Sequence, residues 1–115
     1  MPATVTVEAV DATAAELGGD TGTFRLTRTG TNAFPLAEPL DVMFTLTGTA
    51  LNGVDYQAIR GTATFFAGQS TVDIVVRPIF DGRVEPAETV ILTLTNNGVT
   101  YVVGTPATAT VTIIN

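Results

Sequence analysis

The feature that most constrains the fold is an alternation of apolar and polar residues with a period of two. In residues 41–47, Val42, Phe44 and Leu46 fall on one face of an extended chain, and polar residues fall between them. Because side chains of a β-strand alternate between two faces, this pattern predicts a strand with one face in a core and one in water. The same pattern recurs in residues 23–29, 71–77, 89–95 and 108–114, and more weakly in residues 4–10, 61–66 and 99–103.

Turn-forming residues separate these runs, as at Asn52-Gly53 and Asp81-Gly82. Short alternating runs about 8 to 12 residues apart are typical of an all-β fold, here an immunoglobulin-like antiparallel β-sandwich of about seven strands. A chain of 115 residues has room for one core, so we expect a single domain over residues 1–115. We interpret Arg28 and Arg77 as outward strand residues that pair weakly with acids across the strands.

The residue types that are missing exclude most catalytic chemistry. The sequence has no cysteine, histidine, tryptophan or lysine, and Ser70 is its only serine. Activated serine or cysteine nucleophiles, lysine Schiff bases and thiolate or imidazole zinc sites are therefore excluded. We expect a protein that is not an enzyme but a binding or structural module.

The charge balance restricts the partners. Acidic residues outnumber basic ones by 11 to 5, which gives a net charge of -6. This charge disfavours nucleic acid and anionic membrane surfaces, and it opposes self-association, so we expect the isolated domain to be a monomer. No apolar run approaches the roughly 18 residues of a membrane span, so we expect no direct membrane insertion.

Carboxylates are the remaining reactive groups, and Asp81, Glu85 and Glu88 crowd one short segment between two predicted strands. Their mutual repulsion costs free energy unless they point apart into water or converge on a cation. Both a solvated acidic loop and a cation site are consistent with this spacing. A third alternative, a glycosidase that uses Glu85 and Glu88 as its carboxylate pair, is disfavoured by the small size of the chain and the absence of tryptophan.

Two further acids lie in turn-like surroundings. Glu16 precedes Leu17-Gly18-Gly19, and Asp55 follows Asn52-Gly53-Val54. Each of them alone is more typical of a surface charge than of a metal ligand.

Four segments taken in order resemble the successive signatures of a Calx-beta domain. They are FRLTRTG at residues 24–30, GTALNGVDY at 48–56, DGRVEPAE at 81–88 and ATVTI at 109–113. The resemblance covers nearly the whole chain, and it implies a β-sandwich that binds calcium at one end through acids from several loops. The ligands that it implies here are Glu16, Asp55, Asp81, Glu85 and Glu88.

The resemblance also implies a weak site. Phe80 stands where the family usually has a further acid, and the chain reads Ile114-Asn115 where the family usually has an aspartate cluster. We therefore expect an affinity for Ca²⁺ of about 10⁻⁴ to 10⁻³ M, as in extracellular modules.

The resemblance suggests two biological settings. The first is a non-catalytic calcium-binding repeat of a larger adhesion-type protein, outside the cell or at its surface, in which calcium rigidifies the domain end. Its partners would be neighbouring repeats and a protein or carbohydrate surface ligand, with a role in cell adhesion or cell communication. The alternative is a calcium-sensing regulatory module of a transport protein such as a sodium/calcium exchanger.

Overall fold

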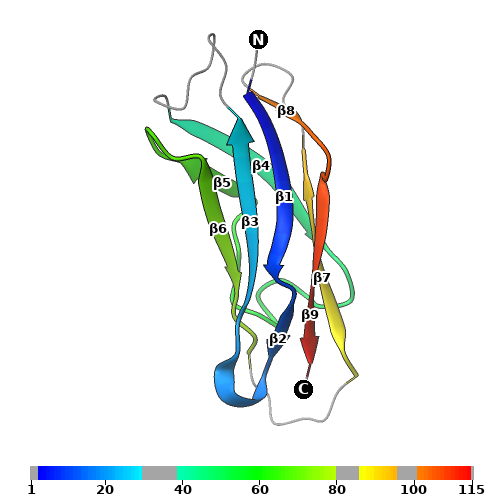
Figure 1. Cartoon of the computed structure of the whole chain (residues 1–115). Helices are drawn as coiled ribbons and strands as arrows, with labels where there is room; N and C mark the ends of the chain where they lie inside the picture. The colour runs from blue at the N-terminus through cyan, green and yellow to red at the C-terminus, as the bar shows by residue number, and fades with distance from the viewer. Residues whose placement is uncertain (1–2, 30–38, 80–85, 96–100, 115) are drawn as a thin grey trace.

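Two β-sheets pack face to face in the computed structural model, which describes residues 3–29, 39–79, 86–95 and 101–114 (Figure 1). The first sheet has the strand order β6-β3-β1-β8, and the second has the order β2-β9-β7-β4-β5. The expected all-β sandwich is therefore confirmed.

The first sheet contains β1 (Ala3–Asp11), β3 (Gly22–Thr29), β6 (Thr71–Val76) and β8 (Tyr101–Val103). The second contains β2 (Thr13–Ala15), β4 (Leu40–Thr47), β5 (Thr62–Phe65), β7 (Glu88–Leu94) and β9 (Thr108–Ile114). A short 3-10 helix, η1 (Leu17–Gly19), follows β2.

The sequence pattern did not predict β2 or the direction of two strand pairs. After an irregularity between Ala9 and Asp11, the chain leaves the first sheet at Ala12 and enters the second as β2. β1 pairs with β8 in parallel, and β2 pairs with β9 in parallel, whereas the other pairs are antiparallel. Alternation reports which face a side chain occupies, but not the direction of the neighbouring strand.

The core follows the predicted alternation. Phe44 of β4 and Leu92 of β7 are buried on the inner face of the second sheet, and Phe24 of β3 is buried on the first. Thr45 and Thr93 lie opposite each other in the β4–β7 ladder, on the alternate face. Full burial of one such apolar side chain stabilises the fold by about 1.5 to 3 kcal/mol.

A buried tyrosine joins the two sheets. Tyr101 belongs to β8 of the first sheet, and its hydroxyl accepts a hydrogen bond from the backbone N–H of Met43 in β4 at 3.1 Å. The same hydroxyl donates to the carbonyl of Thr95, just after β7. The phenol thus fastens β8 to the second sheet through backbone groups that would otherwise need other partners.

The sandwich is elongated, with extents of 51 × 21 × 19 Å. We call the end with η1, the last residues of β6 and β9 and the first residues of β7 the lower end (Figure 1). We call the opposite end, with the first residues of β1 and β4 and the turn between β5 and β6, the upper end. Within the described ranges, no helix is long and apolar enough to cross a bilayer.

Candidate metal centre

The lower end is built around the last residues of β9. In the parallel β2–β9 pair, Ala15 lies opposite Ile114, and the backbone N–H of Glu16 donates to the carbonyl of Ile114 at 3.0 Å. On the other side of β9, Glu88 lies opposite Ile113 in the antiparallel β7–β9 ladder. Two of the predicted ligands, Glu16 and Glu88, therefore flank the same end of one strand.

Glu16 is a buried acid with an unused acceptor. The residue is 8% exposed, and its buried Oε1 atom has no hydrogen-bond partner among the described residues. An unpaired carboxylate oxygen removed from water is costly, because nothing replaces the lost hydration. A hard cation is a partner that would offset this cost, since calcium binds carboxylate oxygens. The residue thus fits the role of a ligand.

Asp55 lies in the loop between β4 and β5 and is only partly exposed. Its Oδ2 atom accepts a hydrogen bond from the backbone N–H of Leu51 at 2.7 Å, and Oδ1 has no such partner in the described part of the chain. Its own carbonyl accepts a hydrogen bond from the N–H of Ile79 at 2.9 Å. Asp55 is therefore fixed beside the last described residue before the acidic segment.

Tyr56 anchors this loop. The side chain is buried, and its backbone forms bridges with Asn52 and with Pro78. Burial raises the pKa of the Tyr56 phenol, and the neighbouring Asp55 carboxylate raises it further. The phenol is therefore neutral at physiological pH and acts as a packing group.

The structure thus brings Glu16, Asp55 and Glu88 to the lower end. Asp81 and Glu85 lie outside the described residues, as does Phe80. Within the described ranges alone, no group of three or more Asp or Glu side chains is close enough to hold a metal ion. The five-ligand site therefore stays a prediction.

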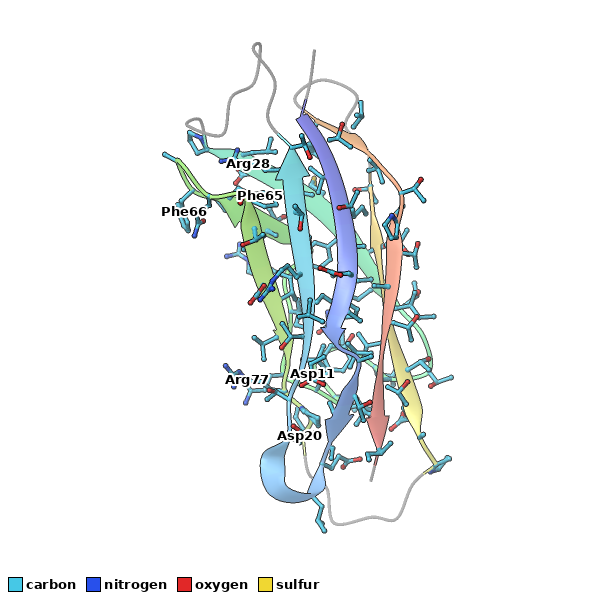
Figure 2. The ribbon with its side chains drawn as sticks, in the orientation of Figure 1. Asp11, Asp20, Arg28, Phe65, Phe66 and Arg77 are labelled. Carbon is cyan, nitrogen blue, oxygen red and sulfur yellow. The ribbon has the colours of Figure 1, made fainter. Side chains whose placement is uncertain are left out.

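Two other acids near the lower half serve the backbone (Figure 2). Asp11 accepts a long hydrogen bond of 3.4 Å from the N–H of Thr13 through Oδ1, in the turn between β1 and β2. The carbonyl of Asp20 accepts from the N–H of Ala15 at 2.9 Å and so closes the turn that contains η1. The Asp11 contact is the local side-chain-to-backbone bond typical of aspartate in turns, whereas the Asp20 contact is made by the main chain alone.

At the upper end, the expectation that Arg28 points outward was wrong. Arg28 is only 4% exposed; its Nε donates to the carbonyl of Gln69 at 2.7 Å, and Nη2 donates to that of Phe66 at 3.1 Å. The guanidinium also lies over the ring of Phe65, 5.2 Å from the centroid (Figure 2). Burial lowers the pKa of Arg28. Arg77 is exposed as expected.

The sequence pattern places Asn52 in a turn and does not predict the contacts of its side chain. Nδ2 of Asn52 donates to the carbonyl of Ile59 at 2.9 Å, and the N–H of Ile59 donates to Oδ1 of Asn52 at 2.9 Å. The Asn52-Gly53 pair signals a turn. A partner seven residues further along the chain leaves no local pattern.

Comparisons with known proteins support the fold. The family model for the Calx-beta domain matches residues 2–115. Comparison with the curated proteins finds no match. Among solved structures, the chain is similar to one described as the apo form of the Calx CBD1 domain, with 22% identity, a TM-score of 0.75, and coverage of 99% of this chain and 97% of that one.

Two longer solved chains are also similar. One is described as CBD12 from CALX1.2, with 22% identity and a TM-score of 0.73, and the match covers 96% of this chain and 44% of that one. The other is described as the calcium binding domain CBD12 of CALX1.1, with 23% identity, a TM-score of 0.71, and coverage of 94% and 43%. At these identities the likeness shows a shared fold.

Proposed function

The chain belongs to the Calx-beta domain family, and on this premise we propose that it is a non-catalytic, calcium-binding regulatory module whose ion binds at the lower end of the sandwich. Bound calcium would neutralise part of the negative charge of the carboxylates at this end. The residues that would hold the ion are Glu16, Asp55, Asp81, Glu85 and Glu88.

The observation that carries this proposal is the buried Oε1 of Glu16, which has no partner in the described part of the chain. A carboxylate in this position destabilises the metal-free domain, so a cation that reaches it gains more than it would at a solvated side chain. Asp55 supports the same conclusion because only its Oδ2 is occupied by a backbone N–H.

The chemistry of the ligands favours calcium over other metals. All the proposed ligands are oxygens, and the chain has no histidine or cysteine for a softer transition metal. Calcium accepts six to eight oxygens from carboxylates, carbonyls and water in a loose geometry, whereas magnesium demands a nearly ideal octahedron. The absence of cysteine, histidine and lysine also supports a non-catalytic role.

Of the two settings expected from the sequence, we propose the regulatory one. One similar solved structure is described as the calcium binding domain CBD12 of CALX1.1 and another as the apo form of the Calx CBD1 domain, and neither description supports the adhesive setting. The position of Glu16 suggests how binding would be transmitted. Its N–H holds the carbonyl of Ile114, so an ion on its carboxylate acts next to the hydrogen bond that fixes the end of β9.

The calcium affinity separates the two settings. A regulatory module must respond in the range of cytosolic sensors, about 10⁻⁷ to 10⁻⁵ M, whereas an extracellular repeat works at about 10⁻⁴ to 10⁻³ M. The regulatory proposal therefore requires tighter calcium binding than the roughly 10⁻⁴ to 10⁻³ M expected from the sequence. Isothermal titration of the 115-residue chain with calcium measures this affinity directly.

Thermal melting tests the site itself. The chain should be melted in calcium, in magnesium at equal ionic strength and in chelator, as the native sequence and as Glu16→Gln, Glu85→Ala and Glu8→Gln. Glu8 is exposed on β1 and is not one of the proposed ligands. Glu8→Gln removes one negative charge, as Glu16→Gln does, so it is the matched control. At a calcium concentration ten times Kd, binding stabilises the native state by about 1.4 kcal/mol. In a domain this small we expect a Tm rise of about 5 to 10 °C.

The variants decide what the rise means. Glu16→Gln and Glu85→Ala should lose most of the calcium-dependent rise, and Glu8→Gln should keep it. Equal shifts in calcium and magnesium, or a full shift in Glu16→Gln, would show that the lower end is a solvated acidic surface.

A further inference from the structure

We propose that the side-chain amide of Asn52 is a positioning group for Asp55, and that it sets the calcium affinity of the lower end without touching the ion. The inference rests on the proposed function, because Asp55 is taken as a ligand. Asn52 lies in the connection between β4 and β5, three residues before Asp55 (Figure 1, green). A group that orients a metal ligand typically changes metal affinity by about tenfold or more when it is removed.

The Asp55 loop is closed by its own hydrogen bonds. The N–H of Asp55 donates to the carbonyl of Leu51 at 2.9 Å, and the Asp55 carboxylate accepts from the N–H of Leu51. Across the turn, the N–H of Gly53 donates to the carbonyl of Tyr56 at 3.0 Å. Gly53 has φ of 83°, a backbone conformation that side chains disfavour, so this turn depends on glycine. The carboxylate is thus part of a ring of backbone contacts.

This ring of contacts is hydrogen-bonded to the chain on both sides of the acidic segment. Beyond β6, the N–H of Ile79 donates to the carbonyl of Asp55. At the start of β7, the N–H of Thr89 donates to Oγ1 of Thr49 at 2.9 Å, and the N–H of Thr49 donates to Oγ1 of Thr89 at 3.2 Å. The loop therefore spans from the residue before the acidic segment to the residue after Glu88.

The side chain of Asn52 closes the loop on its remaining side. The Asn52 amide pairs with both the N–H and the carbonyl of Ile59, each at 2.9 Å, just as a neighbouring strand would. Only a carboxamide offers one donor and one acceptor in this geometry. The side chain of Asn52 is exposed, so it does not hold the loop by packing in the core. Its two hydrogen bonds to Ile59 are therefore what positions the loop.

The amide and the charge can be separated by substitution. Asn52→Asp replaces Nδ2 with an oxygen that faces the carbonyl oxygen of Ile59, so an attraction becomes a repulsion. The same change adds a negative charge near the site, which by electrostatics alone would strengthen calcium binding. Gln57→Glu adds an equal charge to the same loop at an exposed side chain whose described contact is made by its backbone N–H alone.

The experiment compares the native chain, Asn52→Ala, Asn52→Asp and Gln57→Glu by amide hydrogen exchange without metal and by calcium titration. In the two Asn52 variants, the amides of Leu51 and Ile59 should exchange about tenfold faster, while those of Val90 and Leu92 in the core keep their rates. Calcium should bind about tenfold more weakly to both, in spite of the added charge in Asn52→Asp. Gln57→Glu should leave the exchange rates unchanged and should not weaken binding.

Each contrary result has a distinct meaning. Native affinity in Asn52→Ala, or tighter binding in Asn52→Asp, would overturn the positioning role. A matching loss of affinity in Gln57→Glu, or faster exchange at Val90 and Leu92 as well, would also overturn it, because the effect would then be general. If the native chain binds no calcium, the proposed function fails, and the metal-free exchange of Leu51 still decides whether Asn52 holds the Asp55 loop.

Discussion

The two ends of the sandwich treat a buried charge in opposite ways. At the upper end, the Arg28 guanidinium donates to two carbonyls and stacks on an aromatic ring. At the lower end, Glu16 is almost as well buried, yet its Oε1 has no hydrogen-bond partner within the described residues. Within the described residues, the buried cation is therefore satisfied by the protein's own groups, and one oxygen of the buried anion has no partner.

This difference indicates where stability and function lie. A buried charge that is fully hydrogen-bonded locks its surroundings, and here Arg28 fixes the turn between β5 and β6 to β3. A buried charge without a partner makes the free domain less stable, but it reserves binding energy for an external ion. We therefore expect the upper end to be a structural clamp and the lower end to be the responsive one.

Removal of the clamp should give the largest effect. Arg28→Ala leaves the carbonyl of Gln69 without its guanidinium donor and removes the contact with Phe65, so the free energy of unfolding should fall by about 2 to 4 kcal/mol. Urea denaturation measures this loss. Arg28→Lys should recover part of it, because lysine keeps the charge but lacks the planar fork. A loss below about 1 kcal/mol in Arg28→Ala would mean that the clamp is not structural.

Neutralising the lower end should have a smaller effect of the opposite sign. Glu16→Gln removes the buried charge, so the metal-free domain should become more stable by about 1 kcal/mol. In saturating calcium the order should reverse, because only the native carboxylate is stabilised by the ion. Urea melts in chelator and in calcium compare the two conditions. A destabilised Glu16→Gln in chelator would show that the carboxylate already has a favourable partner.

The two ends should also be independent. In the double variant Arg28→Ala, Glu16→Gln, the changes in the free energy of unfolding should add to within about 0.5 kcal/mol, because the two residues lie at opposite ends of the elongated sandwich. Measurement of all four proteins in chelator completes this cycle. A coupling above about 1 kcal/mol would show that the core transmits a signal from one end to the other.

The smallest effect on the free energy of unfolding is expected for Arg25, which lies on β3 with Arg28. Arg25 forms an ion pair with Asp73, with Nε to Oδ1 at 2.9 Å and both side chains 42% exposed, so Arg25→Ala should cost far less than Arg28→Ala. The hydrogen bond from Arg25 lowers the pKa of Asp73. Any stability from this pair is therefore present above the usual aspartate pKa and is lost as the pH falls through the lowered value. Melts of both proteins from pH 7 to pH 2 should converge at the acid end, and a difference that grows there would contradict this assignment.

The strand positions could be predicted from the sequence because each strand carries its own alternation. The burial of Arg28 was not predicted in this way. Its even spacing from Phe24 and Leu26 places Arg28 on the inner face of β3, so the outward interpretation was wrong. The carbonyls of Phe66 and Gln69 that make its burial favourable come from a turn about forty residues later, which no local pattern reveals.

The candidate site was only partly predictable for a related reason. Glu16, Asp55 and Glu88 were selected through the family resemblance, and the fold does place them at one end. The features that suit these acids to metal binding arise only on folding. Burial leaves Oε1 of Glu16 without a partner among the described residues, and the Asn52 amide pairs with the backbone of Ile59. Spacing alone could identify the acids but could not rank them.

The parallel pairing of the terminal strands has a mechanical consequence. β1 begins at the upper end and pairs with β8, and β9 finishes at the lower end and pairs with β2 (Figure 1). A force that pulls Ala3 and Ile114 apart along the long axis acts along these strands and not across them. The hydrogen bonds of each ladder must then break together in shear, whereas a hairpin pulled open from one end loses them one at a time. The resistance of a domain to tension is set by its unfolding rate, and we expect this geometry to slow unfolding under force.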